Sequence, residues 1–293
     1  MMPNRAMDPA ILQERLYELV VRTSTELPPD VLEALREARR AETSGTPACA
    51  ALETIAANTV LAKEKKLPLC QDTGMPHFFI SAPDGVLHRP VEEAACKAVA
   101  RATADGLLRQ NCVEVPSGRN TGNNLGYVSP VFHWETGEAQ SSMEITLLLK
   151  GGGSENVGIQ YSLPDSRLKA GRDLDGVRKC VLDAACQAQG KGCAPGIIGV
   201  AMGGDRSGGC EEAKHQLLRR IGQRSPMPEV AELETRLLAE VNQLGIGPMG
   251  LGGRTTALEV FIGCRTRHPA SFFVTVCYNC WCCRRQTIRI EVK

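Results

Sequence analysis

The sequence has almost no net charge and no long run of one charge sign or of apolar residues. Its 34 lysines and arginines balance 33 aspartates and glutamates, which leaves a formal net charge of +1. Without a basic run, nothing points to nucleic acid or to an anionic membrane surface as a partner. No window approaches the ~18 apolar residues of a membrane span, and the polar N-terminus lacks a signal-type apolar core. We therefore expect a cytoplasmic protein with no membrane and no nucleic-acid partner, although a basic pocket could still bind an acidic substrate.

Internal repeats and low-complexity tracts are also missing from the sequence. The composition is that of a soluble globular protein, with 43% hydrophobic and 23% charged residues. A chain of 293 residues has room for one large domain or two ordinary ones. We prefer a single domain over residues 1–293, and a separate helical N-terminal lobe is the alternative.

The spacing of apolar and turn-forming residues predicts helices and strands along the whole chain. Asp8-Pro9 forms an N-cap and first-turn pair for a helix that runs to about residue 20. The further expected elements are helices at 29–41, 48–66, 90–107, 173–190, 207–221 and 228–244, and strands at 76–81, 142–150, 196–202, 256–262, 271–277 and 286–292. Helices and strands alternate through the second half, so we expect an α/β fold, a layered mixed sheet with helices and a helical N-terminal lobe.

Thirteen cysteines are many for a chain that is expected to stay in the cytoplasm. The odd number excludes complete internal pairing, and reduced thiols, some of them metal-bound, fit better than a disulfide scaffold. Cys70 opens the segment Cys70-Gln71-Asp72-Thr73-Gly74, where thiol, amide, carboxylate and hydroxyl groups occur consecutively. Packing does not require that combination, whereas a site with a soft ligand beside hydrogen-bonding groups does. A turn with an idle cysteine is the alternative.

Cys193 and four cysteines near the C-terminus are further candidate ligands. Cys193 is expected between a helix and a buried strand, where an ordinary buried thiol is the simpler explanation. Cys277, Cys280, Cys282 and Cys283 crowd the last β segment. A CxxC pair such as Cys277–Cys280 is typical of zinc or redox chemistry, but structural zinc would need a second pair. If this segment is extended, alternation puts Cys280 and Cys282 opposite Cys277 and Cys283, which favours one ligand among the four.

Two glycine-rich loops and two polar residues show less specific patterns. Loops 151–156 and 245–253 would let main-chain N–H groups approach a small carboxylate, although neither matches a nucleotide-binding motif and tight turns would also explain them. Arg109 is expected at the end of a helix, where a cation is favourable for the helix dipole alone. His268 precedes a strand, where a surface or capping role is the simpler explanation. These positions alone do not indicate a catalytic role for Arg109 or His268.

Six motifs, taken in order, resemble those of a known family. They are Cys70-Gln-Asp-Thr-Gly, Lys150-Gly-Gly-Gly-Ser-Glu-Asn, Gly192-Cys-Ala-Pro-Gly, Gly203-Gly-Asp, Gly245-Ile-Gly-Pro and Cys280-Trp281. The order resembles the alpha part of class I, iron–sulfur-dependent fumarate hydratases and the closely similar alpha subunit of L-tartrate dehydratase, over about residues 8–292. This resemblance implies a hydro-lyase that hydrates fumarate, a small dicarboxylate, reversibly to L-malate.

The resemblance also implies a cofactor. Cys70, Cys193 and Cys280 would ligate a [4Fe-4S] cluster. Three ligands would leave one iron open to the substrate as a Lewis acid.

Roles for residues around the substrate follow from the same resemblance. Gln71 and Asp72 would contact the substrate, with Asp72 also taking part in the proton network. Arg109 would pair with a substrate carboxylate, for which its planar guanidinium is well suited. Gly153 would offer its backbone N–H, and His268 would be a proton donor or orienting group near the leaving oxygen.

Two departures from the family pattern bear on the prediction. Family members carry other residues where this chain has Cys282 and Cys283. They also need a beta region, which supplies further basic residues and the catalytic base and has no counterpart in this sequence. We therefore expect this chain to be the alpha subunit of a heterotetramer, with a separate beta chain as its partner.

Two other hypotheses also fit the sequence. The first is an L-tartrate dehydratase alpha subunit; the loop 153–156, Gly-Ser-Glu-Asn, has the fumarase form and favours fumarate, although the two substrates differ only in hydroxylation. The second is a non-catalytic metal-binding or redox protein that uses the cysteine-rich tail. It predicts zinc or a disulfide at Cys277–Cys283 and no role for Cys70 or Cys193.

Overall fold

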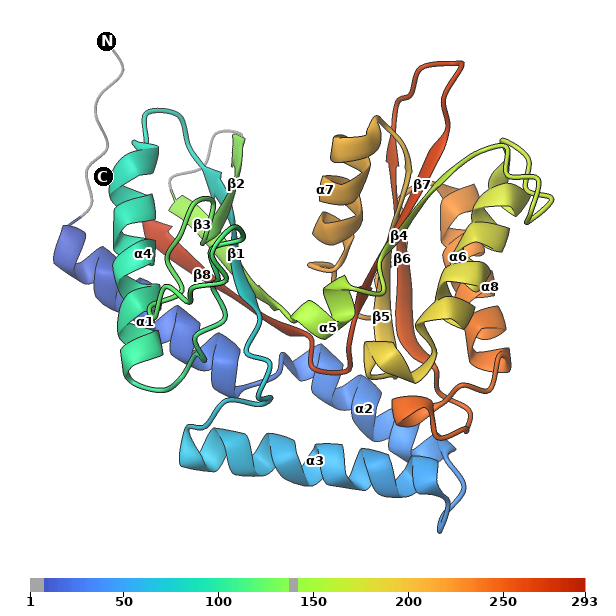
Figure 1. The fold of residues 1–293 in the computed structure, drawn as a ribbon, viewed down its shortest axis with the longest axis horizontal. Coiled ribbons are helices and arrows are strands. Elements are labelled where there is room, and N and C mark those ends of the chain that lie inside the picture. The colour runs from blue at the N-terminus through green and yellow to red at the C-terminus, as the bar shows by residue number, and fades with distance from the viewer. Residues whose placement is uncertain (1–7, 137–141, 293) are drawn as a thin grey trace. The chain divides into compact units, whose positions relative to one another are not determined.

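The fold is a mixed α/β arrangement with a helical N-terminal region, as predicted (Figure 1). It is taken from a computed structural model that describes residues 8–136 and 142–292. Contacts divide the chain into two compact units built from interleaved segments. The first unit comprises Met1–Pro28, Asn58–Gly152 and Cys283–Lys293, and the second comprises Pro29–Ala57 and Gly153–Cys282. The single cluster-binding domain over residues 1–293 stays a prediction.

The first unit is a four-stranded sheet with two helices packed on it. The strand order is β2 (Val131–Thr136), β1 (Met75–Ala82), β3 (Ser142–Lys150) and β8 (Arg284–Glu291). β1 and β2 are parallel, whereas the β1–β3 and β3–β8 pairs are antiparallel. The helices α1 (Pro9–Thr25) and α4 (His88–Ala104) contribute Leu16, Val20 and Val99 to a core that also contains Phe78 and Ile145 of the sheet.

The second unit is a four-stranded sheet with helices on both faces (Figure 1). The strand order is β4 (Ile159–Ser162), β7 (Phe273–Asn279), β5 (Gly196–Gly203) and β6 (Ala257–Arg265). The helices α6 (Leu174–Ala188) and α8 (Pro228–Gln243) cover one face, where Val181 and Leu237 pack against Val200, Val276 and Tyr278. The helix α7 (Arg206–Gln216) covers the other face so closely that a Cβ at Gly199 would lie 2.2 Å from a backbone oxygen of α7.

Three further α-helices lie in the described part of the chain. They are α2 (Pro29–Ala41), α3 (Pro47–Lys65) and the short α5 (Gly152–Glu155). In α2 the buried residues Val31, Ala34, Leu35 and Ala38 recur at the spacing of one helical face, which explains why this segment is a helix with one apolar side. In the described part of the chain, no helix combines the length and the apolar character that a membrane crossing needs.

Most of the elements expected from the sequence are confirmed, some to the residue. The helix 29–41 and the strand 142–150 have the predicted bounds, and Asp8 caps α1 by accepting a 2.8 Å hydrogen bond from the backbone N–H of Ala10. The strands β2 and β4 were not predicted, because both are short and lack a clear alternation of apolar residues. The predicted helix 90–107 ends at Ala104.

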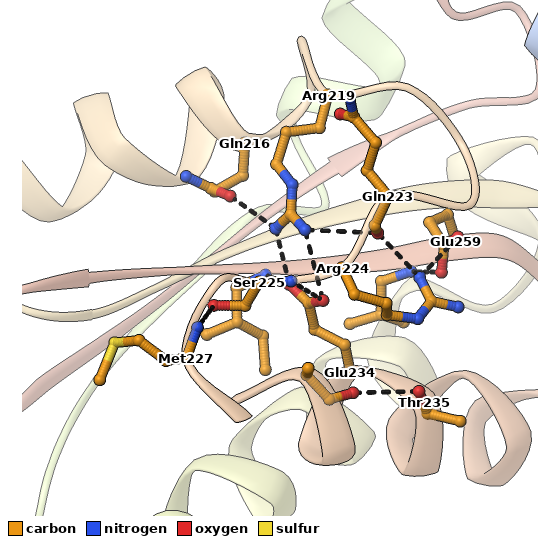
Figure 2. Close-up of polar contacts among 12 residues, drawn as sticks. Gln216, Arg219, Gln223, Arg224, Ser225, Met227, Glu234, Thr235 and Glu259 are labelled. Atoms are coloured by element: carbon orange, nitrogen blue, oxygen red, sulfur yellow. Dashed lines mark hydrogen bonds and ion pairs between the residues drawn. The ribbon is translucent and has the colours of Figure 1, made fainter. Parts of the chain in front are cut away.

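The connection between α7 and α8 is held by buried carboxylates (Figure 2). The fully buried Glu234 accepts hydrogen bonds from the Arg219 guanidinium at 2.6 and 3.3 Å and from the backbone N–H groups of Ser225 and Ile262 at 2.9 and 2.8 Å. A second buried carboxylate, Glu259 of β6, pairs with an arginine of the same connection. Glu234 therefore ties this loop to α8 and to the edge strand β6 with four hydrogen bonds.

Candidate functional site

The segment Cys70–Gly74 enters β1 in the first unit and is anchored by Thr73. This side chain is fully buried, and its Oγ1 accepts hydrogen bonds from the backbone N–H of Arg109 at 3.0 Å and from Asn111 Nδ2 at 2.9 Å. Asn124 in turn donates to the Arg109 carbonyl oxygen at 2.7 Å. These contacts bring the backbone of Arg109 beside the motif that contains Gln71 and Asp72. Arg109 and Gln71 are exposed, as groups that meet a substrate should be.

The position of Arg109 corrects one prediction. The helix α4 ends at Ala104, so Arg109 lies in the following loop and not in the last helical turn. Its place depends on the hydrogen bond to Thr73, and helix-dipole stabilisation does not account for it.

Asp72 is held against the end of β3 by close backbone packing. The buried Arg284 donates from Nη1 to the Asp72 carbonyl oxygen at 2.6 Å and from Nη2 to that of Leu149 at 3.4 Å. A Cβ at Gly151 would lie 2.9 Å from Asp72 Oδ2, and one at Gly74 would lie 2.8 Å from the Lys150 carbonyl carbon. Gly74 also has a φ of +79°, which favours glycine. The two glycine motifs of this unit thus let the Asp72 segment and the β3 end approach each other.

In the second unit, Cys193 lies in a loop shaped around the ring of Tyr278. The helix α6 ends in a 3₁₀ turn at Gln189–Gly192, and Cys193 follows with a left-handed backbone. A Cβ would lie 2.5 Å from a Tyr278 ring carbon at Gly192 and 2.2 Å from another at Gly196. The glycines of the Gly192-Cys-Ala-Pro-Gly motif therefore leave space for this ring.

Cys280 lies beside the same loop. The backbone N–H of Trp281 donates to the Cys193 carbonyl oxygen at 3.2 Å. Burial, and then the neighbouring thiols of Cys280 and Cys193, raise the pKa of Tyr278. Both candidate ligands are thus near one tyrosine.

Strand register explains why these residues meet. β5 and β7 are antiparallel with Ile197 opposite Asn279, so Cys193, just before β5, and Cys280, just after β7, lie at one end of the sheet. β4 is antiparallel to β7 and starts opposite Val276, so the Gly153 loop enters β4 from that same end. Three of the predicted site residues are therefore brought to one end of the sheet by segments far apart in the sequence.

His268 lies at the opposite end of this sheet. Together with the Gly204–Asp205 loop and Arg265 it lines a cavity of about 520 Å³. Its Nδ1 accepts a hydrogen bond from the Ala270 N–H at 3.1 Å. The register between the Ile197–Asn279 and Met202–Val274 pairs spans five residues of β5, or about 17 Å. The structure therefore does not bring His268 to the Cys193–Cys280 end of its own unit.

The cysteine-rich tail is not the continuous strand on which its alternation was predicted. β7 ends at Asn279 and β8 begins at Arg284, so Cys280, Cys282 and Cys283 lie in the break between two strands. Cys282 and Cys283 are buried. Within residues 8–136 and 142–292, no three His, Cys, Asp or Glu side chains form a group able to hold a metal ion, in the tail or elsewhere. Cys70 belongs to the first unit, and the other two predicted ligands belong to the second.

Several residues that shape the site were missed by sequence reasoning. They are Thr73, Asn111, Asn124, Tyr278, Asn279 and Arg284. Nothing local in the sequence marks these residues, because their partners are distant in the chain.

Comparisons with known proteins agree with the motif order. The family model described as fumarate hydratase (Fumerase) matches residues 13–289. A Geobacillus stearothermophilus protein provisionally named a class I fumarate hydratase is 48% identical over 283 residues, which is 96% of this chain but 55% of that protein. The chain thus spans about half the length of this relative. The L(+)-tartrate dehydratase alpha subunit of Escherichia coli K12 is 32% identical over 281 residues, covering 96% of this chain and 91% of that subunit.

Proposed function

Because this chain belongs to the fumarate hydratase family, we propose that it is the cluster-bearing alpha part of a hydro-lyase that hydrates fumarate reversibly to L-malate. The observation that carries the proposal is the sheet register of the second unit, which collects Cys193, Cys280 and the Gly153 loop at one end. Fumarate is preferred over tartrate because the identity to the class I fumarate hydratase relative is 48%, against 32% for the tartrate dehydratase alpha subunit.

The proposed cofactor is a [4Fe-4S] cluster held by Cys70, Cys193 and Cys280. Thiolates are the ligands that such clusters require. The Tyr278 hydroxyl and the Asn279 amide are buried near Cys193 and Cys280, which suits a site that accommodates a further polar group. When bound with three cysteine ligands, the cluster supplies a Lewis-acidic iron that polarises the substrate hydroxyl.

The residues of the first unit would bind and orient the dicarboxylate. Arg109 presents an exposed guanidinium suited to a carboxylate, and its backbone is fixed by Thr73. Gln71 would donate from its amide, and the Asp72 carboxylate would accept or relay a proton. The buried Arg284 holds the Asp72 backbone, so it would keep that carboxylate in one orientation. From the second unit, Gly153 would donate its backbone N–H to the substrate.

His268 would serve the site of a second alpha chain. About 17 Å of β-sheet separates it from the cysteine pair of its own unit, a distance longer than a small dicarboxylate. The proposed heterotetramer contains two alpha chains, so each could supply His268 to the other. Mixing the inactive variants Cys280→Ser and His268→Asn should then restore part of the activity. No restoration after subunit exchange would contradict this arrangement.

The proposed partner is a beta subunit in the cytoplasm. The tartrate dehydratase subunit named alpha is matched over 91% of its length, whereas the class I fumarate hydratase relative is matched over 55%. The unmatched part of the longer relative would correspond to the beta chain. That chain would supply the remaining substrate-binding groups and the base that removes the proton from carbon 3.

Metal analysis tests the cofactor first. After anaerobic reconstitution, the wild-type chain should hold about four irons and about four sulfides, and Cys70→Ser, Cys193→Ser and Cys280→Ser should each lower that content. Cys210→Ser is the matched control, because Cys210 is an exposed cysteine of α7 that has no proposed ligand role. A single bound zinc that is unaffected by Cys70→Ser would contradict the proposal. It would favour a non-catalytic metal-binding protein that uses the cysteine-rich tail.

Activity tests the substrate and the partner. With its cognate beta chain, the reconstituted protein should hydrate fumarate faster than it dehydrates L(+)-tartrate, and it should lose activity in air because an open iron is accessible to oxidants. The reverse substrate preference would identify a tartrate dehydratase. Full activity of the alpha chain alone would show that no beta chain is needed.

A further inference from the structure

The hydroxyl of Tyr278 is a buried donor for which the described residues provide no acceptor. The residue is 3% exposed, and its ring fills the space that Gly192 and Gly196 leave open. The hydroxyl oxygen itself would lie 2.3 Å from a Cβ at Gly196. The hydroxyl therefore lies against the loop that carries Cys193.

Asn279 is a second buried group of this kind. It is 1% exposed, and in the described part of the chain neither its Nδ2 nor its Oδ1 has a hydrogen-bond partner. It is the last residue of β7 and directly precedes Cys280. Alternation along β7 places it on the face opposite Tyr278. Two unpaired polar groups thus flank the point where β7 reaches the candidate ligand.

Such groups carry a cost that calls for an explanation. An unsatisfied buried donor or acceptor destabilises a folded protein by about 1–3 kcal/mol, and most buried polar groups are paired for that reason. A tyrosine hydroxyl has one proton to donate, and an asparagine amide has two. The Tyr278 ring lies against the loop that carries Cys193, and Asn279 directly precedes Cys280, so the sulfur atoms at these ligands are candidate acceptors.

We propose that Tyr278 and Asn279 donate hydrogen bonds to the sulfur atoms of the iron–sulfur cluster and of its ligands Cys193 and Cys280, and thereby raise its reduction potential and slow its loss. This inference rests on the proposed function, since it requires the cluster. Hydrogen bonds to sulfur draw negative charge from a cluster and are one of the main determinants of its potential. Both are positioning residues, because neither needs to touch the substrate.

The variants Tyr278→Phe and Asn279→Leu separate this role from a purely structural one. Tyr278→Phe keeps the ring over the two glycines and removes only the hydroxyl. In the cluster-free protein, each change removes an unpaired polar group, so the melting temperature should stay the same or rise. In the reconstituted protein, the midpoint potential from an anaerobic redox titration should fall, and iron loss to a chelator should become several-fold faster. Complete loss of the cluster from a variant that still folds would also support the proposal.

Tyr161→Phe is the matched control. Tyr161 is a buried tyrosine of the same unit whose hydroxyl donates to Asp183 Oδ2 at 2.7 Å. Removal of this hydroxyl should lower the melting temperature of the cluster-free protein and leave the potential and the iron-loss rate unchanged. This pattern is the opposite of the one expected for Tyr278→Phe and Asn279→Leu.

The outcomes are distinguishable. A wild-type protein that takes up no cluster would refute the proposed function and this inference together. If the wild type holds a cluster, a wild-type potential and iron-loss rate in one variant would remove that residue from the proposal. The same result in both variants would overturn the proposal while leaving the proposed function intact.

Discussion

Removing the carboxylate of Glu234 should destabilise the second unit strongly. The side chain is fully buried and is paired with Arg219, whose side chain is 18% exposed. Glu234→Ala would leave this guanidinium without its charge partner in a mostly buried position. It would also take the hydrogen-bond acceptor from the backbone N–H groups of Ser225 and Ile262. Breaking a buried ion pair costs about 3–5 kcal/mol, and the two amides favour the upper part of that range.

The matched control is Glu232→Ala, because Glu232 is an exposed residue on the same helix. At about 2–4 °C per kcal/mol for a unit of this size, Glu234→Ala should lower the melting temperature by about 6–20 °C, whereas Glu232→Ala should change it little. Thermal unfolding of the cluster-free protein, followed by far-ultraviolet circular dichroism, measures this difference. Glu234→Gln keeps the shape but removes the charge and one of the two acceptor oxygens, so its melting temperature should lie between the two.

Amide hydrogen exchange locates the effect. The N–H groups of Ser225 and Ile262 should exchange faster in Glu234→Ala, and amides of the first unit should not. The unfolding free energies of Glu234→Ala and Glu232→Ala should therefore differ by several kcal/mol. A difference below about 0.5 kcal/mol, which is ordinary for surface substitutions, would refute this reasoning. The network in Figure 2 would then contribute no net stability.

Three further predictions concern ionisable groups and one glycine. The hydrogen bond from Arg167 lowers the pKa of Asp183, so the stability that this carboxylate contributes is present above the unfolded pKa of about 3.9 and is lost as pH falls through the lower folded pKa. Asp183→Asn should therefore lower the melting temperature at neutral pH and flatten its dependence on acidification; equal stability of variant and wild type at neutral pH would contradict this. Burial raises the pKa of Cys180 to about 12, so iodoacetamide at mildly alkaline pH should modify the exposed Cys210 readily and Cys180 only after unfolding, which peptide mass spectrometry can show. Gly192→Ala would place a Cβ 2.5 Å from an aromatic ring carbon, and urea unfolding should show a loss of about 1–3 kcal/mol; an unchanged midpoint would mean that the ring can move.

The elements of the fold could be predicted largely because their signals are local. In the helix 29–41, apolar residues recur on one helical face. The strand 142–150 is a largely buried stretch of residues that is followed by three glycines. β2 and β4 were missed because their pairing partners, and not their own residues, make them strands. The end of α4 was misplaced because Arg109 is held by Thr73, a residue earlier in the chain.

The candidate site was predictable only as a set of motifs. Composition and spacing could not choose Cys193 and Cys280 from thirteen cysteines, and the motif order did so by resemblance. In the structure the two cysteines lie near each other, because the Tyr278 ring lies against the Cys193 loop and the backbone N–H of Trp281 donates to the Cys193 carbonyl oxygen. It also separates His268 from them, which the short interval between His268 and Cys280 in the sequence did not suggest, because β7 runs the length of the sheet between the two.

The sequence by itself therefore determined most of the elements, their order and the membership of the family, since helix periodicity, capping and glycine motifs depend on neighbouring residues. Only the tertiary structure decided which end of the sheet each motif occupies. That choice follows from strand direction and register, which are set by backbone hydrogen bonds between segments distant in sequence. For the same reason the buried Tyr278 and Asn279, ordinary residues in the printed sequence, became recognisable as donors only once β7 was seen to end beside Cys193 and Cys280.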